Sequence, residues 1–118
     1  MITSLAFVLY PVSDVTAARK FYEGALGLRL THEFGGAWFE YDLGDSTFAI
    51  CSADAEHPVP VRGALAAFEV DDLDAEVTRL KSLGILPTGT IVDTPVCRFV
   101  SLRDPDGSEL ILHRRKST

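Results

Sequence analysis

Cysteine is scarce in this sequence, and long apolar runs are absent. The 118 residues include two cysteines, Cys51 and Cys97, which lie in separate apolar segments and not in a C-x-x-C pair. We therefore expect no disulfide framework, and two small buried thiols in a reducing cytosol. No basic segment precedes an apolar one near Met1, and no apolar stretch approaches the length of a membrane span. These absences predict a cytoplasmic protein with no membrane partner.

Several catalytic motifs and an excess of positive charge are also missing. The sequence has no Gly-x-Ser-x-Gly, no glycine-rich phosphate loop, and no His near Cys or Ser at a recognisable spacing. It has 11 Lys and Arg against 17 Asp and Glu, and three of the basic residues lie together at 114–116. Because an acidic surface repels phosphate backbones, nucleic acid is not an expected partner, and a cationic ligand is favoured.

The most informative feature that is present is an internal repeat. A segment that opens Val-Ser-Asp at Val12 and closes Leu-Gly-Leu at Leu28 recurs from Val70 to Ile85, with an offset of 58 residues at its start and 57 at its end. A period near half the chain length indicates two copies of one unit, each too small to bury its own apolar face. We predict one domain of two modules, residues 1–53 and 63–113, joined by a linker at 54–62 and followed by a basic tail at 114–118.

Each module is predicted to form a strand, a helix and three further strands. In the first module a strand over 5–12 leads to a helix that Ser13 or Asp14 caps and that Gly27 ends. In the second module Asp71 or Asp72 caps the helix and Gly84 ends it. The remaining strands are expected at 28–34, 37–43, 46–51, 86–91, 96–103 and 108–113, the last of them after the turn Asp104-Pro105-Asp106-Gly107.

These residues carry a family resemblance. The strand that ends Val-Ser-Asp, the helix with Phe-Tyr and Leu-Gly-Leu, the second opening Phe-Glu-Val-Asp-Asp-Leu-Asp and the final Asp-Pro-Asp-Gly turn resemble the glyoxalase, bleomycin-resistance and extradiol-dioxygenase superfamily, also called vicinal oxygen chelate. The resemblance implies an α+β fold of two tandem βαβββ modules, which form a curved eight-stranded sheet around a shared cleft. It does not fix the activity, since that fold hosts lyases, dioxygenases, transferases and drug-sequestering binders.

The resemblance also locates the family's metal-ligand positions, which are apolar in this chain. Members with metal chemistry carry His, Gln or Glu at the positions that match Phe7, Leu65 and Ile111, and at a fourth position that we match to Phe48. None of these side chains offers a lone pair to a divalent cation. His113 lies two residues beyond Ile111, too far along the strand to replace it. We therefore expect no metal and no cofactor.

Strand alternation and the resemblance together predict the lining of the cleft. Phe39 and Tyr41 form the more apolar face of their strand and are expected under the helix, which turns Trp38 and Glu40 toward the cleft. The candidate ligand-binding residues are Phe7, Trp38, Glu40, Phe48, Leu65, Glu69, Phe99, Ser101 and Ile111. Aromatic rings with carboxylates at the rim suit a flat ligand that carries positive charge.

The expected function is metal-independent binding of a small aromatic or cationic molecule, by a homodimer that resembles the bleomycin-resistance branch and acts in antibiotic resistance by sequestration. One alternative is a glyoxalase- or dioxygenase-like lyase or isomerase with an atypical or metal-free site, in which Glu69 or Glu109 acts as general base beside His113 or Arg103. Another alternative is a structural module whose cleft is filled by side chains.

Overall fold

The computed structural model describes residues 1, 3, 5–60 and 65–116. It divides into two compact units, Met1–Pro60 and Val61–Thr118, which we call module 1 and module 2. Each contains one four-stranded sheet and its helical segment, so the predicted α+β fold of two tandem modules is confirmed. In the described residues the eight strands form two separate four-stranded sheets and not one hydrogen-bonded sheet of eight. The shared cleft stays a prediction.

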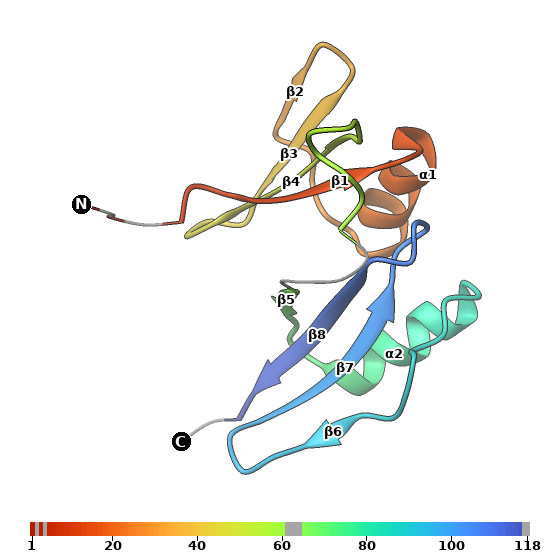
Figure 1. Cartoon of the computed structure of the whole chain (residues 1–118). Helices are drawn as coiled ribbons and strands as arrows, with labels where there is room; N and C mark the ends of the chain where they lie inside the picture. The colour runs from red at the N-terminus through yellow and green to blue at the C-terminus, as the bar shows by residue number, and fades with distance from the viewer. Residues whose placement is uncertain (2, 4, 61–64, 117–118) are drawn as a thin grey trace. The chain divides into compact units, whose positions relative to one another are not determined.

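Module 1 has the strand order β1-β4-β3-β2, with β1 parallel to β4 and the other pairs antiparallel. Its helical segment packs on one side of this sheet (Figure 1). Its elements are β1 (Val8–Val12), α1 (Val15–Arg19), the π-helix η1 (Lys20–Ala25), β2 (His32–Phe34), β3 (Trp38–Asp42) and β4 (Thr47–Ser52).

Module 2 repeats this arrangement with the order β5-β8-β7-β6, and β5 is parallel to β8. Its elements are β5 (Ala66–Glu69), α2 (Leu73–Ser82), β6 (Val92–Asp93), β7 (Cys97–Arg103) and β8 (Glu109–Arg115). No helix in the described part of the chain is long and apolar enough to cross a membrane.

The helix ends follow the predicted repeat. Asp14 Oδ1 accepts a hydrogen bond of 3.1 Å from the backbone N–H of Ala17, and Asp72 Oδ1 accepts one of 3.0 Å from Ala75. These caps satisfy N–H groups that the first turn of a helix leaves without partners. Asp14 and Asp72 are 58 residues apart in the sequence, and so are Ala17 and Ala75. Gly27 and Gly84 have φ values of 76° and 81°, a left-handed conformation that favours glycine at a helix end.

The core of module 1 is aromatic and lies between the sheet and the helical segment. Tyr22 of η1 is fully buried, and its ring centroid lies 5.0 Å from that of Phe48 in β4. Phe48 also contacts the rings of Tyr10 and Tyr41. The core of module 2 is aliphatic, with Leu73, Val77 and Leu80 of α2 buried together with Val100, Leu102, Leu110 and Leu112 of the sheet.

Several predicted boundaries are wrong. The first strand begins at Val8 and not at residue 5, and the segment 86–91 is not a strand. Pro87 has no N–H to donate to a ladder, which is consistent with a strand, β6, that starts only at Val92. The last strand also extends past its predicted end at residue 113: β8 continues to Arg115, and the backbone N–H of Lys116 donates to the carbonyl of Val96.

Candidate functional site on the helix-free sheet faces

Each sheet has one face under its helix and one face opposite, which we call the distal face. In module 1 the buried rings of Phe39, Tyr41 and Phe48 mark the helix side. Alternation and register then assign the distal face, because directly paired residues point to the same side of a sheet. The distal face of module 1 comprises Leu9, His32, Phe34, Trp38, Glu40, Ala49 and Cys51.

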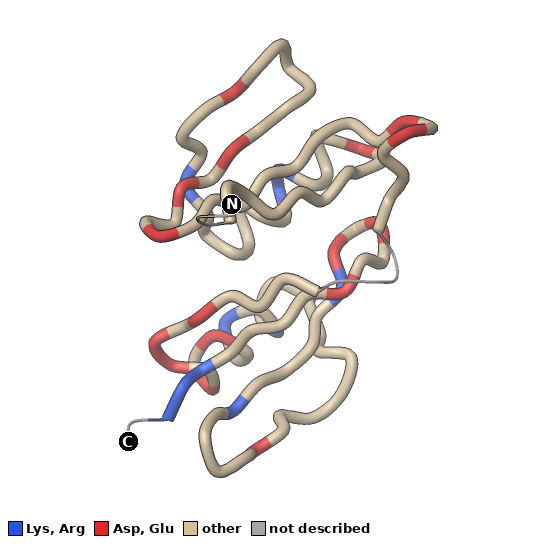
Figure 2. Tube along the Cα trace, turned by 60° about the vertical axis from the view of Figure 1, so that its left-hand side comes forward, with Lys and Arg blue, Asp and Glu red and all other residues tan. Residues whose placement is uncertain are grey.

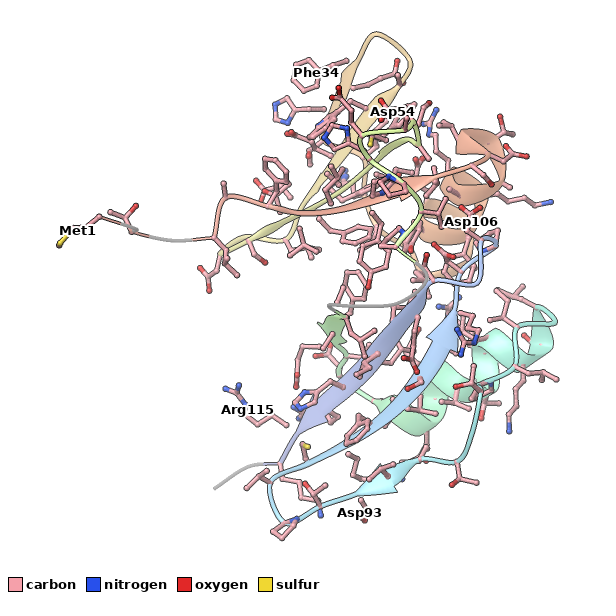
Figure 3. All side chains as sticks on the ribbon, in the orientation of Figure 1. Met1, Phe34, Asp54, Asp93, Asp106 and Arg115 are labelled. Atoms are coloured by element: carbon pink, nitrogen blue, oxygen red, sulfur yellow. The ribbon has the colours of Figure 1, made fainter. Side chains whose placement is uncertain are left out.

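Trp38 is the centre of an aromatic cluster on this face. Its ring lies edge to face with Phe7, with centroids 5.5 Å apart and planes at 89°. Phe34 is its register partner on β2 and is 55% exposed at the β2–β3 hairpin (Figure 3). In β3 the buried residues Phe39 and Tyr41 alternate with Trp38 and Glu40, so Trp38 and Glu40 point away from the helix. The face therefore offers accessible rings for stacking.

Glu40 is already engaged by its neighbours. The indole Nε1 of Trp38 donates to Glu40 Oε2 at 2.9 Å, and Glu40 Oε1 lies 3.9 Å from His32 Nδ1. The Glu40 side chain is 26% exposed. The carboxylate thus fixes the indole and still presents negative charge beside it, which suits a cation stacked on the ring.

The assignment of Phe48 to the cleft is wrong. Its side chain is 2% exposed and lies in the core under the helix. Ile111 pairs with Ala67 in module 2, and the corresponding pair in module 1 is Ala49 with Leu9. Ala49, one residue beyond Phe48, is therefore the equivalent of Ile111, because a shift of one residue turns a side chain to the other face.

The distal face of module 2 combines apolar and polar residues. Register places Phe99 opposite His113, and Ser101 opposite Ile111, on β7 and β8. Glu69 of β5 pairs with His113 from the other side of β8. Leu65 precedes β5, lies on the same face by alternation, and is 45% exposed. The predicted residues Leu65, Glu69, Phe99, Ser101 and Ile111 therefore share one face.

Glu69 and His113 form a tight polar pair. Glu69 Oε1 lies 2.6 Å from His113 Nδ1, and Glu69 Oε2 accepts a hydrogen bond of 2.7 Å from the backbone N–H of Arg115. These two contacts, the backbone one first, hold the pKa of the Glu69 carboxyl below its usual value despite partial desolvation. The guanidinium of Arg114 lies 3.7 Å from the same carboxylate and acts in the same direction.

A hollow of about 450 Å³ lies beside this pair and is lined by Glu69, Arg114, Arg115 and Lys116. Lys and Arg gather at this end of β8 in Figure 2, and the side chain of Arg115 extends away from the strand in Figure 3. Lys116 is held by Asp93 and by the carbonyl of Thr94. The basic residues at this end are therefore part of the folded module.

A second hollow, of about 480 Å³, lies on the helix side of module 1, where the sequence predicted no site. The Arg19 guanidinium lies 4.7 Å from the ring centroid of Phe39, bonds Glu23 at 2.7 Å, and approaches Glu33 at 3.8 Å. Tyr41 donates its hydroxyl to Glu23 at 2.8 Å. Arg19 is therefore held by two carboxylates and by the ring of Phe39, contacts that serve the packing of the helical segment on the sheet. The spacing of Arg19 and Glu23 by four residues was the only sequence signal for these contacts.

The family's metal does not fit the residues at its positions. Phe7, Leu65, Ile111 and Ala49 have no side-chain donor atoms, and the described residues contain no group of three His, Cys, Asp or Glu that could hold an ion. Divalent metals need nitrogen, oxygen or sulfur ligands. No chemistry through a metal is derived for this site.

Comparisons with known proteins agree with this architecture. The chain is similar to the antibiotic-binding protein TnmS3 from Streptomyces sp. CB03234, with 26% identity, 98% of each chain covered and a TM-score of 0.81. It is also similar to a glyoxalase/bleomycin resistance protein from the same organism, with 28% identity, 92% of this chain and 98% of that chain covered, and a TM-score of 0.74.

A lactoylglutathione lyase from Agrobacterium tumefaciens has a TM-score of 0.72 with 97% and 95% coverage, but its 22% identity shows the fold alone. No curated protein sequence matches the chain. The family model for the Glyoxalase/Bleomycin resistance protein/Dioxygenase superfamily matches residues 4–112. With the repeated βαβββ modules and this match over most of its length, the chain belongs to that superfamily.

Proposed function

We propose that this protein is a metal-independent binder of small molecules, which sequesters an aromatic, preferably cationic, ligand. The observation that carries the proposal is the distal face of module 1, where the accessible ring of Trp38 lies between Phe7 and the carboxylate of Glu40. Such a surface binds a flat cation by stacking and by charge. The similarity to an antibiotic-binding protein supports the same class of function.

The absence of donor atoms at the family's metal positions also favours binding over metal-assisted catalysis. Phe7, Leu65 and Ile111 contribute apolar surface in place of ligands. A lyase is among the similar structures, but at its level of identity it supports no enzymatic assignment. The proposal includes a cytoplasmic location. It also includes assembly as a homodimer, because each sheet leaves two edge strands and large apolar side chains such as Phe34 and Val96 are exposed.

Titration with three planar probes tests the proposal. Proflavine is a cation, anthracene-9-carboxylate an anion and anthracene-9-methanol neutral, and all three have three fused rings. Trp38 is the sole tryptophan, so a bound ring quenches its emission. We expect proflavine to bind most tightly and to raise the melting temperature.

The Glu40→Gln variant isolates the role of charge. It should weaken the binding of proflavine, more at low salt than at high salt, and leave the affinity for the neutral probe unchanged. Glu33→Gln is the matched control, because Glu33 lies on the neighbouring strand β2 but on the helix side, beside Arg19. If none of the probes changes either the emission of Trp38 or the melting temperature, the proposed function is wrong.

A further inference from the structure

The pair Glu69 and His113 differs from the other histidine contacts of the chain in its geometry. Its oxygen to nitrogen distance is 2.6 Å, against 3.3 Å for His57 with Asp54 and 3.9 Å for His32 with Glu40. Both residues belong to paired positions of the parallel strands β5 and β8. The Glu69 carboxylate is held in turn by the backbone N–H of Arg115. The Glu69 carboxylate therefore fixes the position of the His113 ring, and the backbone of Arg115 fixes the carboxylate.

This contact determines which ring nitrogen carries the proton. An ionised carboxylate has only acceptors, and the lowered pKa of Glu69 keeps it ionised near neutral pH. His113 Nδ1 must then donate to Glu69 Oε1, so a neutral His113 has its lone pair on Nε2. Among the described residues no hydrogen-bond partner of Nε2 is present. The side chain is 26% exposed, so this acceptor is accessible.

His113 has two apolar neighbours on the distal face. Phe99 is its register partner on β7, and Ile111 precedes it by two residues on β8, so both flank the ring on the same side of the sheet. Both are partly exposed. An aromatic ligand that lies on Phe99 and Ile111 can direct a hydroxyl group to Nε2. A ligand without a donor would leave this acceptor without a partner, which costs binding energy.

We infer that His113 contacts the ligand as a hydrogen-bond acceptor, held in one tautomer by Glu69, and that the site prefers aromatic ligands with a hydroxyl group. The inference rests on the proposed function, because it specifies which small aromatic molecules the protein binds. It adds His113, which the sequence suggested only as the partner of a general base, to the candidate ligand-binding residues. Glu69 acts here as a positioning residue, and it is not the partner of a ligand cation.

The tautomer is tested first, on the free protein. Long-range proton to nitrogen-15 correlation NMR distinguishes a protonated ring nitrogen from one with a lone pair. We expect the neutral imidazole of His113 to carry its proton on Nδ1 and to have an unprotonated Nε2 in the wild-type protein. In Glu69→Gln the amide can also donate to Nδ1, so a mixture of the two tautomers is expected. A neutral ring that carries its proton on Nε2 and its lone pair on Nδ1 would overturn the inference before any ligand is added.

The ligand preference is tested with a matched pair of probes, 2-naphthol and 2-methoxynaphthalene. In the second probe a methyl group replaces the hydroxyl proton, so that it cannot donate a hydrogen bond. Calorimetry on the wild-type protein should give about fivefold tighter binding of the naphthol, the effect of one neutral hydrogen bond. Addition of the naphthol, but not of the ether, should shift the Nε2 resonance. In His113→Phe both probes should bind with equal affinity.

The control variant is His57→Gln, since His57 also pairs with a carboxylate but lies outside both distal faces. It should keep the fivefold preference. Wild-type protein that binds both probes equally would overturn the inference and leave the proposed function intact. Wild-type protein that binds neither these probes nor proflavine would overturn both. The wild-type measurements decide the question even if His113→Phe does not fold.

Discussion

Replacement of Trp38 by Ala separates ligand binding from stability. The change removes the edge-to-face contact with Phe7, at 5.5 Å between centroids, and the 2.9 Å hydrogen bond from the indole to Glu40. Trp38 is only half-buried, so most of the cavity cost that follows truncation of a core ring does not apply. The indole is therefore expected to matter more for the ligand than for the fold.

The magnitude follows from these two contacts. An aromatic pair contributes about 0.5–1.5 kcal/mol and a hydrogen bond about 0.5–1.5 kcal/mol, so the free energy of unfolding should fall by about 1–3 kcal/mol. Phe48→Ala is the comparison, because Phe48 is 2% exposed and contacts three tyrosine rings. It should cost about 3–5 kcal/mol. Proflavine binding should weaken by about 1–3 kcal/mol in Trp38→Ala, the effect of losing a central aromatic contact.

Urea unfolding followed by circular dichroism gives the stability of each variant, and calorimetry gives the affinity for proflavine. Phe34→Ala serves as a control for a ring on the same face that is 55% exposed and should change stability little. The reasoning is refuted if Trp38→Ala destabilises the protein as much as Phe48→Ala while proflavine binds with unchanged affinity. Trp38 would then be a structural residue.

Three further outcomes are expected. The hydrogen bonds from Arg19 and Tyr41 keep the pKa of Glu23 low, so their stabilisation is present above the unfolded pKa of about 4.5 and is lost as the pH falls through the folded value. Melting temperatures from pH 7 downward should therefore decline less steeply in Glu23→Gln. Elemental analysis should find no stoichiometric zinc, nickel, manganese or iron, and none of these ions should raise the melting temperature; a tightly held ion would contradict the binding function. Sedimentation at micromolar concentration should give a homodimer, whereas a strict monomer would favour a cleft filled by side chains.

The repeat made the backbone predictable from the sequence. Asp14 and Asp72 cap their helices with the same contact, and Gly27 and Gly84 end them with the same left-handed conformation. These are local interactions, which depend on residue types at short spacings. The orientation of Trp38 was also predictable, because alternation in β3 places its neighbour Phe39 in the core.

The error at Phe48 has a defined cause in the turns. Two residues separate Gly44 from the start of β4, whereas one residue separates Gly107 from the start of β8, so counting from the two glycines does not reach equivalent positions. The difference of one residue moves the match from Ala49 to Phe48 and from one face to the other. Both side chains lack a metal donor, so the correction changes the lining of the site and not the conclusion about metal.

The contacts of the carboxylates could not be predicted from the sequence. Glu40 bonds an indole two residues away, and Glu69 bonds a ring nitrogen 44 residues further along the chain. Both carboxylates appeared from the sequence as equal partners for a ligand cation. The structure distinguishes them, since Glu40 lies in the aromatic cluster of module 1 and Glu69 is occupied by His113 and by a backbone N–H. Such partners depend on strand register, which composition and spacing do not specify.

Register also shows how far the two modules have diverged. Pro11 pairs with Cys51 in module 1, and the equivalent pair in module 2 is Glu69 with His113. Pro11 has no N–H, which is tolerated on the edge strand β1. Burial raises the pKa of the Cys51 thiol, with a smaller contribution from Asp54, so this pair presents no charge near neutral pH. One backbone arrangement therefore carries an apolar pair in one module and a hydrogen-bonded polar pair in the other. Family membership fixes that backbone, whereas the ligand preference that we propose depends on a few side chains of the distal faces.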